Sequence, residues 1–138
     1  MLKGIPEQIS PELLKILSEM GHGDEIVLAD GNFPGCSHNN RVVRADGQSV
    51  AVLLDAILKL FPLDVDSESY SFVMATDDGH VPSAFGVYNE VLCSHGYEIG
   101  VCPLPRQDFY NRSHSAYTVI ATTDKTLYAN IILRKGCV

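Results

Sequence analysis

Short apolar runs without polar alternation constrain the fold of this chain more than any other feature. In residues 25–30, four apolar residues follow one another before Gly31, Asn32 and Pro34 end the run. Residues 71–75 form a second such run. A strand that is apolar on both sides must have both faces of its sheet covered. We therefore expect a sheet that lies between two layers of helices.

Segments with helical periodicity separate these runs. A helix is predicted over residues 11–20, where a serine and a proline precede apolar residues spaced three or four positions apart. A second helix is predicted to begin after Ser49 and to end before Pro62. Two further helices are predicted over residues 82–96 and 106–115.

Three shorter segments complete the predicted sheet. They are residues 98–102, 117–123 and 128–133, and a turn at 124–126 is expected to pair the last two as a mixed edge. Strands that alternate with helices are typical of α/β domains, and 138 residues suit one domain. We expect an α/β fold, a three-layer single domain over residues 1–138 with a largely parallel, mixed central sheet flanked by helices.

Charge and cysteine content exclude several classes of protein. The formal net charge is −7 and the ten Lys and Arg residues are scattered, so no nucleic-acid partner is expected. No run approaches the roughly 20 apolar residues that cross a bilayer, so no membrane partner is expected. Residues 1–6 lack the apolar core of a secretory signal, and the cysteines form no C-x-x-C pair. We expect a cytoplasmic protein whose four cysteines are free thiols.

Motifs for metals and nucleotides are missing from the sequence. His38, His80, His95 and His114 have no metal-ligand spacing, so no metal site is expected. No glycine-rich phosphate loop follows a predicted strand, which argues against a nucleotide-binding regulatory domain. We therefore expect no cofactor.

Two candidate functional residues flank the first apolar run. His22 lies between two glycines where a helix ends and a strand begins. That position suits a general acid, and it equally suits a surface histidine that offsets the helix dipole. Asp30 ends the run, where its carboxylate must accept hydrogen bonds from a sugar hydroxyl or from a loop amide. Ligands of such sheets bind beyond the carboxyl ends of the strands, which favours Asp30 and the loop 31–40.

Further polar candidates lie near the C-terminus. Arg106 follows a rigid Pro-Leu-Pro segment that could direct its guanidinium at polyol oxygens, although an isolated arginine is more often a solvated surface charge. Tyr128 and Asn130 are two residues apart at the start of a predicted strand, so both could reach one polar ligand. The alternative is a packed tyrosine and an asparagine that serves the turn.

Several motifs together resemble those of the L-fucose mutarotase family. The first is SPELL at residues 10–14 and the last is YANIIL at 128–133, so the resemblance covers most of the chain. Between them lie EMGHGDEI at 19–26, RADG at 44–47 and FY at 109–110. The related D-ribose pyranases share the Gly-His, Ala-Asp and Tyr-Ala-Asn-Ile-Ile-Leu features and are the nearest alternative.

The resemblance implies a role for each candidate residue. His22 matches the family's proton donor. The family's sugar-binding positions match Asp30, Arg106, Tyr128, Ala129 and Asn130. The resemblance further implies a cofactor-free isomerase that interconverts the α and β anomers of L-fucopyranose, in a ring-shaped homo-oligomer, typically a decamer, with sites near subunit contacts. Tyr128 is expected to act as the catalytic partner of His22 at the second sugar oxygen.

A non-catalytic sugar-binding module is the alternative from a different class. Such a module would use the same aspartate, arginine, tyrosine and asparagine to hold the sugar, because binding alone needs no proton donor. The role of His22 distinguishes the two interpretations.

Overall fold

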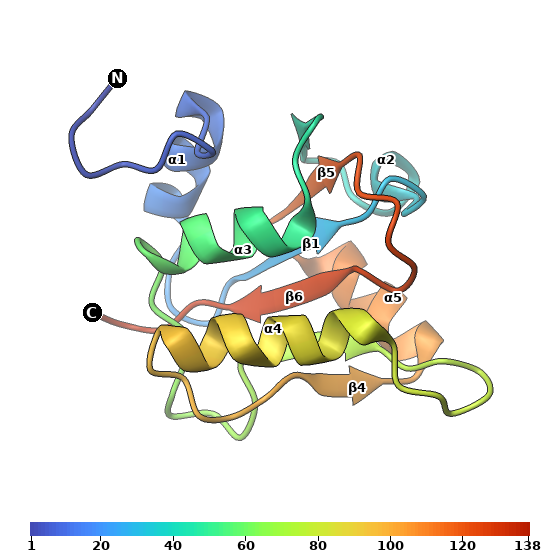
Figure 1. Ribbon diagram of the computed structural model, residues 1–138. Helices are drawn as coiled ribbons and strands as arrows, with labels where there is room; N and C mark the ends of the chain where they lie inside the picture. The colour runs from blue at the N-terminus through green and yellow to red at the C-terminus, as the bar shows by residue number, and fades with distance from the viewer.

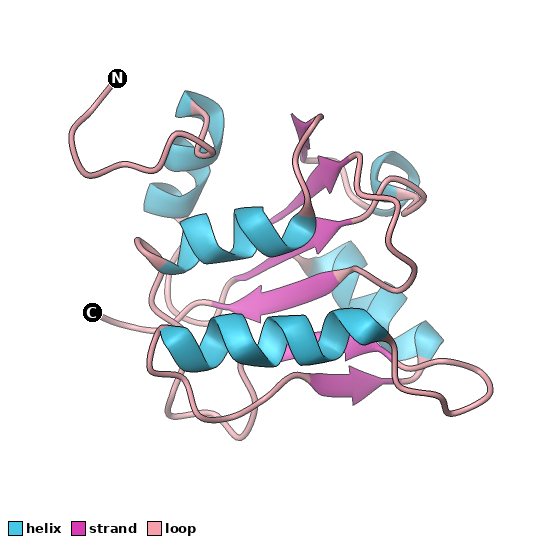
Figure 2. Cartoon of the chain, in the orientation of Figure 1, coloured by secondary structure: helices cyan, strands magenta, loops and turns pink.

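Six strands form one mixed sheet in the computed structural model, which describes residues 1–138 (Figures 1 and 2). In chain order the strands are β1 (Glu25–Ala29), β2 (Val42–Ala45), β3 (Ser71–Met74), β4 (Cys102–Leu104), β5 (Thr118–Thr122) and β6 (Ile131–Arg134). Their order across the sheet is β2-β5-β1-β6-β3-β4. Strand β6 runs antiparallel to β1 and β3, and the remaining pairs are parallel. The predicted α/β class with a mixed, largely parallel sheet is confirmed.

Helices cover both faces of the sheet, as the apolar strands require. They are α1 (Pro11–Glu19), α2 (Gly35–His38), α3 (Val50–Leu58), α4 (Ser83–Ser94) and α5 (Arg106–Ser115). Helices α1, α3 and α4 contribute to the larger core cluster, and α5 contributes Phe109 to the smaller one. Figure 1 shows α3 and α4 in front of the sheet and α5 behind it.

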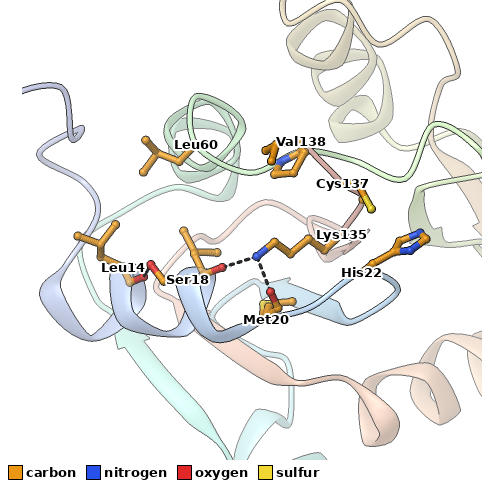
Figure 3. A pocket seen from close by; sticks show the side chains of 11 residues that line it. Leu14, Ser18, Met20, His22, Leu60, Lys135, Cys137 and Val138 are labelled. Atoms are coloured by element: carbon orange, nitrogen blue, oxygen red, sulfur yellow. Dashed lines mark hydrogen bonds between the residues drawn. The ribbon is translucent and has the colours of Figure 1, made fainter.

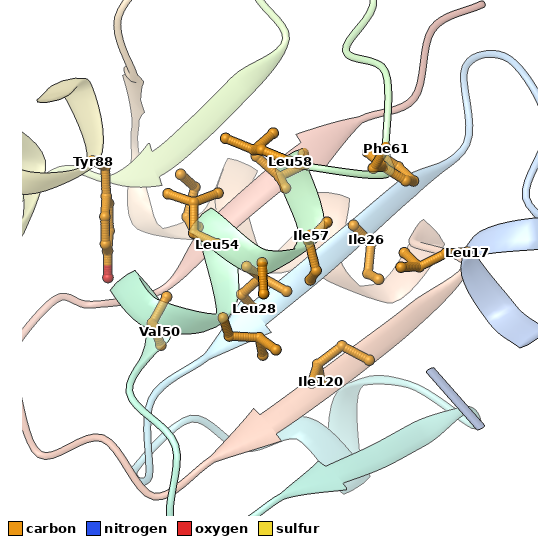
Figure 4. Close-up of a cluster of buried hydrophobic side chains, with 14 of the residues drawn as sticks. Leu17, Ile26, Leu28, Val50, Leu54, Ile57, Leu58, Phe61, Tyr88 and Ile120 are labelled. Carbon is orange, nitrogen blue, oxygen red and sulfur yellow. The ribbon is translucent and has the colours of Figure 1, made fainter. Parts of the chain in front are cut away.

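Strand β1 shows why its sequence lacks polar alternation. Ile26 and Leu28 belong to the core cluster that includes Ile57 of α3, and these side chains lie together in Figure 4. Val27 and Ala29 belong to the cluster on the opposite face. These four residues of β1 are fully buried, so every position from 26 to 29 must be apolar.

The helix starts use the capping residues that predicted them. The Ser10 side chain accepts a hydrogen bond from the Leu13 backbone N–H at 3.1 Å at the start of α1. The Ser49 side chain accepts from the Val52 N–H at 3.3 Å at the start of α3. Both satisfy backbone donors that have no partner within the helix.

The C-terminal strands differ from the prediction. We expected residues 117–123 and 128–133 to pair with each other at an edge, but β1 lies between β5 and β6. The connection therefore passes over the carboxyl end of β1, where the Gly31 N–H donates to the Asp124 carbonyl at 2.8 Å. The antiparallel strand is inside the sheet rather than at its edge.

Short elements account for the other differences. Strand β4 is Cys102–Leu104 rather than 98–102, and it contains Pro103. A proline is tolerated there because β4 is an edge strand and one side of it has no neighbour to accept an N–H. Strand β2 and helix α2 were not predicted, since four residues are too few to establish a period.

The cysteines and the helices bear on two expectations from composition. All four cysteines are free, as expected, and Cys36, Cys93 and Cys137 are exposed. None of the helices combines the length and the apolar character that crossing a membrane requires.

Candidate functional site

A pocket of about 370 Å³ opens at the carboxyl ends of β1 and β3, where β6 begins. It is lined by Asp30, Asn32, Phe33, Pro34, Met74, Arg106, Tyr110, Leu127, Tyr128 and Asn130. Four of these side chains, Asp30, Arg106, Tyr128 and Asn130, are candidates from the sequence, and they come from three separate segments. The carboxyl edge of a sheet that contains parallel strands is where such folds place their ligands. The structure therefore brings these four candidates together.

Asp30 and Asn130 are joined directly. The backbone N–H of Asp30 donates to the Asn130 side-chain oxygen at 2.8 Å, and the Asn32 N–H donates to Asp30 Oδ1 at 2.9 Å. Burial raises the pKa of the Asp30 carboxyl, and backbone N–H groups at Asn32, Phe33 and Ala129 partly offset that effect. The carboxylate is thus held rigidly at the pocket and is short of water, so a sugar hydroxyl would be a favourable partner.

Tyr128 has an unusual backbone conformation. Its φ is 56°, and it has the only positive φ outside glycine. Such strain concentrates at functional sites, where the surrounding structure must maintain it. The Tyr88 hydroxyl supplies one restraint, because it donates to the carbonyl of Ala129. Tyr128 therefore lies in a turn rather than opening the strand as predicted, since β6 begins at Ile131.

Ala129 lies between two lining residues but does not itself line the pocket. Its side chain is fully buried. Its carbonyl is already bound to Tyr88, whose own pKa is raised by burial. Ala129 thus serves as the buried connection that sets Tyr128 and Asn130 two residues apart.

Arg106 begins α5, and Pro105 alone separates it from β4. Its Nη2 lies 2.9 Å from Asp77 Oδ2, and 47% of its side chain is exposed. A guanidinium has five N–H donors in a fixed plane, so one contact with Asp77 leaves others for a ligand. The structure places Arg106 at the pocket rather than on a remote surface.

An aromatic wall on one side of the pocket was not predicted. Phe33 and Tyr110 both line it, with ring centroids 6.0 Å apart, and Phe33 also packs edge-on against Phe109. Met74, at the end of β3, is a further apolar lining residue. The available signal was an aromatic residue three positions after Asp30. Sequence alone could not show that α5 brings Tyr110 beside it.

His22 lies at the opposite end of β1 from this pocket. The five residues of β1 span about 16 Å of extended chain between them. His22 lines a different cavity, of about 470 Å³, together with Leu14, Leu60 and Val138 (Figure 3). Lys135 also lines this cavity and donates to the carbonyls of Leu17 and Met20. Within one chain, the structure does not bring His22 to the other candidates.

A buried carboxylate accompanies His22. The Nε2 atom of His22 lies 3.3 Å from Asp64 Oδ1, and Arg134 Nε donates to Asp64 Oδ2 at 2.9 Å. Only 6% of the Asp64 side chain is exposed, whereas 55% of the His22 side chain is. The hydrogen bond from Arg134 is the main cause that lowers the pKa of Asp64, and His22 lowers it further. Asp64 was not predicted, because a single aspartate after Pro62-Leu63 carries no motif.

The chain is similar to proteins of known name over nearly its whole length. The model of the RbsD / FucU transport protein family matches residues 3–138. The fucose mutarotase of Danio rerio is 43% identical over 145 residues, covering 100% of this chain and 95% of that protein. The L-fucose mutarotase of Haemophilus influenzae (strain 86-028NP) is 45% identical over 139 residues, covering 99% and 96%.

A solved structure has the same fold as this chain. The crystal structure of the fucose mutarotase in complex with L-fucose from Streptococcus pneumoniae matches with a TM-score of 0.95 and 49% identity. The match covers 99% of each chain. The resemblance noted in the sequence is thereby confirmed.

Proposed function

Because this chain belongs to the RbsD / FucU transport protein family, we propose that it is an L-fucose mutarotase, an isomerase that interconverts the α and β anomers of L-fucopyranose. One observation carries the proposal. Asp30, Arg106, Tyr128 and Asn130 converge on one pocket in a chain that is 49% identical to a fucose mutarotase solved with L-fucose. A monosaccharide fits such a pocket, with polar groups for its hydroxyls and an aromatic wall for its apolar side.

The reaction needs only proton transfers. The ring opens when the ring oxygen gains a proton and the anomeric hydroxyl loses one, and it recloses after rotation about the C1–C2 bond. A positioned acid or base typically contributes about 10²- to 10⁴-fold, which suits a reaction that already proceeds slowly in water. Tyr128 serves one of the two oxygens, while Asp30, Arg106 and Asn130 hold the remaining hydroxyls. No cofactor is required.

His22 is the proposed proton donor, and we propose that it acts on a site in another copy of the chain. It lies about 16 Å of strand away from the pocket of its own chain, too far for a direct contact. A homo-oligomer, a ring-shaped decamer by the family resemblance, would place the His22 of one subunit over the pocket of the next. Its half-exposed side chain beside an apolar cavity suits such an interface.

Asp64 gives that histidine a defined orientation. A carboxylate that contacts one ring nitrogen fixes the orientation of the ring. The hydrogen bond from Arg134 lowers the pKa of Asp64, so Asp64 is ionised at neutral pH. Asp64 is therefore a positioning residue for the donor.

We also place the protein in the cytoplasm. Three of its four free cysteines are exposed, and exposed thiols persist in a reducing compartment.

NMR exchange spectroscopy of the anomers tests the proposal. Micromolar protein should accelerate exchange between α- and β-L-fucopyranose, and D-ribose should be a poorer substrate in the same assay. Faster exchange of D-ribose than of L-fucose would favour a pyranase. Saturable fucose binding without any acceleration would identify a non-catalytic sugar-binding module.

A further inference from the structure

A loop that follows β3 reaches two residues of the sugar pocket. Asp77 Oδ2 lies 2.9 Å from Arg106 Nη2. Three residues later, the His80 ring meets the Tyr128 ring edge-on, with centroids 6.0 Å apart and planes 83° apart. Neither Asp77 nor His80 lines the pocket, so their contacts with it run through Arg106 and Tyr128.

Hydrogen bonds within the loop hold His80 in place. The Thr76 hydroxyl donates to the His80 carbonyl at 2.8 Å, and the His80 N–H donates to Asp78 Oδ1 at 3.2 Å. The same Asp78 oxygen lies 2.5 Å from His80 Nδ1. These bonds from His80 lower the pKa of Asp78 to about 2, so Asp78 is ionised at neutral pH and fixes the ring. Gly79, with φ of 76°, allows the turn between them.

Tyr128 needs such support from outside its own segment. Its left-handed backbone is strained, and a strained residue holds one geometry only when neighbours determine it. The Tyr88 bond fixes the backbone at Ala129 but does not touch the Tyr128 ring. The His80 ring provides an edge-on aromatic contact to that ring.

We propose that residues 76–80 form a positioning loop of the sugar site, in which Asp77 orients Arg106 and His80, held by Asp78, orients Tyr128. This inference rests on the proposed mutarotase function. It assigns the two contacts to different steps, because Arg106 holds hydroxyls in the ground state whereas Tyr128 takes part in proton transfer. Loss of Asp77 should therefore change KM, and loss of His80 should change kcat.

The test compares Asp77→Asn and His80→Ala in the anomer-exchange assay over a range of L-fucose concentrations. Asp77→Asn should raise KM by about fivefold and change kcat by less than about twofold. His80→Ala should lower kcat by about tenfold with little change in KM. His80→Phe, which keeps an aromatic ring against Tyr128, should recover most of that loss.

Matched controls lie in a second aspartate–histidine pair. His95 Nε2 lies 2.8 Å from Asp55 Oδ1 across α3 and α4, and neither residue lines the sugar pocket. Asp55→Asn and His95→Ala should leave KM and kcat near the parent values. Asp77 is largely exposed, so its ion pair with Arg106 adds little stability. Asp77→Asn should therefore have the same melting temperature as the parent.

Several outcomes would overturn the inference. Parent-like kinetics in both Asp77→Asn and His80→Ala would show that the loop does not position the site. Equal changes of KM and kcat in the two variants, or no rescue by His80→Phe, would do the same. If the parent itself fails to accelerate exchange, the proposed function fails instead, and the two failures are thereby distinguished.

Discussion

The two ends of β1 offer a sugar different chemistry. The carboxyl end carries a pocket with the polar side chains of Asp30, Arg106, Tyr128 and Asn130 and an aromatic wall. The amino end carries one half-exposed imidazole, His22, beside a buried carboxylate and an apolar cavity. The first end is equipped to hold a polyol, whereas the second is equipped to move a proton.

Under the proposed function, this difference means that one chain alone would not form a complete site. Both ends are joined by the same strand, in which residues 26–29 are fully buried, so no local motion can bring them together. If both ends act on one sugar, they must come from different copies of the chain. Each of the following predictions tests whether sugar binding and proton transfer depend on different residues.

The largest effect is expected for His22→Ala. Anomer exchange under saturating L-fucose should fall by about 10² or more, because the proton donor is lost. Fucose binding should persist, since the pocket residues are unchanged. Exchange spectroscopy gives the rate and calorimetry gives the affinity. His95→Ala, which removes another histidine paired with an aspartate, is the matched control. A parent-like rate in folded His22→Ala would transfer the donor role to Tyr128.

A smaller loss is expected for Asp64→Asn. Without its carboxylate partner, the His22 ring loses its fixed orientation, so kcat should fall by about tenfold while KM stays near the parent value. Exchange kinetics measure both. Asp66→Asn, at an exposed position two residues later, is the control for substitution in this segment. A change confined to KM would show that Asp64 acts on binding instead.

Asp30→Asn should lower the affinity for L-fucose rather than the rate of exchange. The amide can still accept the Asn32 N–H but makes a weaker hydrogen bond to a hydroxyl, so affinity should fall by several-fold, about 1 kcal/mol. The rate in the saturated complex should change little. Titration calorimetry with L-fucose checks the first statement and exchange spectroscopy checks the second. A rate loss as steep as that of His22→Ala would refute the division of roles.

The smallest effect concerns stability and pH. Burial raises the Asp30 pKa above its ordinary value of 3.8, so the native state binds more protons than the unfolded state. The free energy of unfolding should therefore fall as pH rises from about 4 through the raised pKa. Asp30→Asn should lack this contribution and gain stability relative to the parent over that range. Urea unfolding of both proteins at several pH values measures the two free energies of unfolding. If the difference between them did not change with pH, this prediction would be wrong.

The sequence predicted those features that depend on local pattern. The runs of β1 and β3, the serine caps of α1 and α3, and the bounds of α5 all follow from periodicity or from single capping residues. Chain order does not determine which strand lies between two others, and so the insertion of β1 between β5 and β6 was missed.

Some residues of the candidate site could be predicted from local sequence, and others could not. Asp30 and Arg106 were found because each follows a strand or a rigid turn. Tyr110 and Asp64 were missed, because the first reaches the pocket only through the packing of α5 and the second is recognisable only beside His22 and Arg134. The sequence also grouped His22 with Asp30 as one site; within one chain β1 separates them, so that grouping remains a prediction about two copies of the chain.

Mixed oligomers of two inactive variants test whether each site combines His22 and Tyr128 from different subunits. His22→Ala and Tyr128→Phe each lack one proton-transfer group, so each should be nearly inactive alone. If a site takes His22 from one subunit and Tyr128 from the next, random 1:1 assembly leaves about one quarter of the sites intact. Co-assembled protein should then recover about one quarter of the parent exchange rate. A rate equal to the average of the two separate variants would show that His22 and Tyr128 of one site do not come from different subunits.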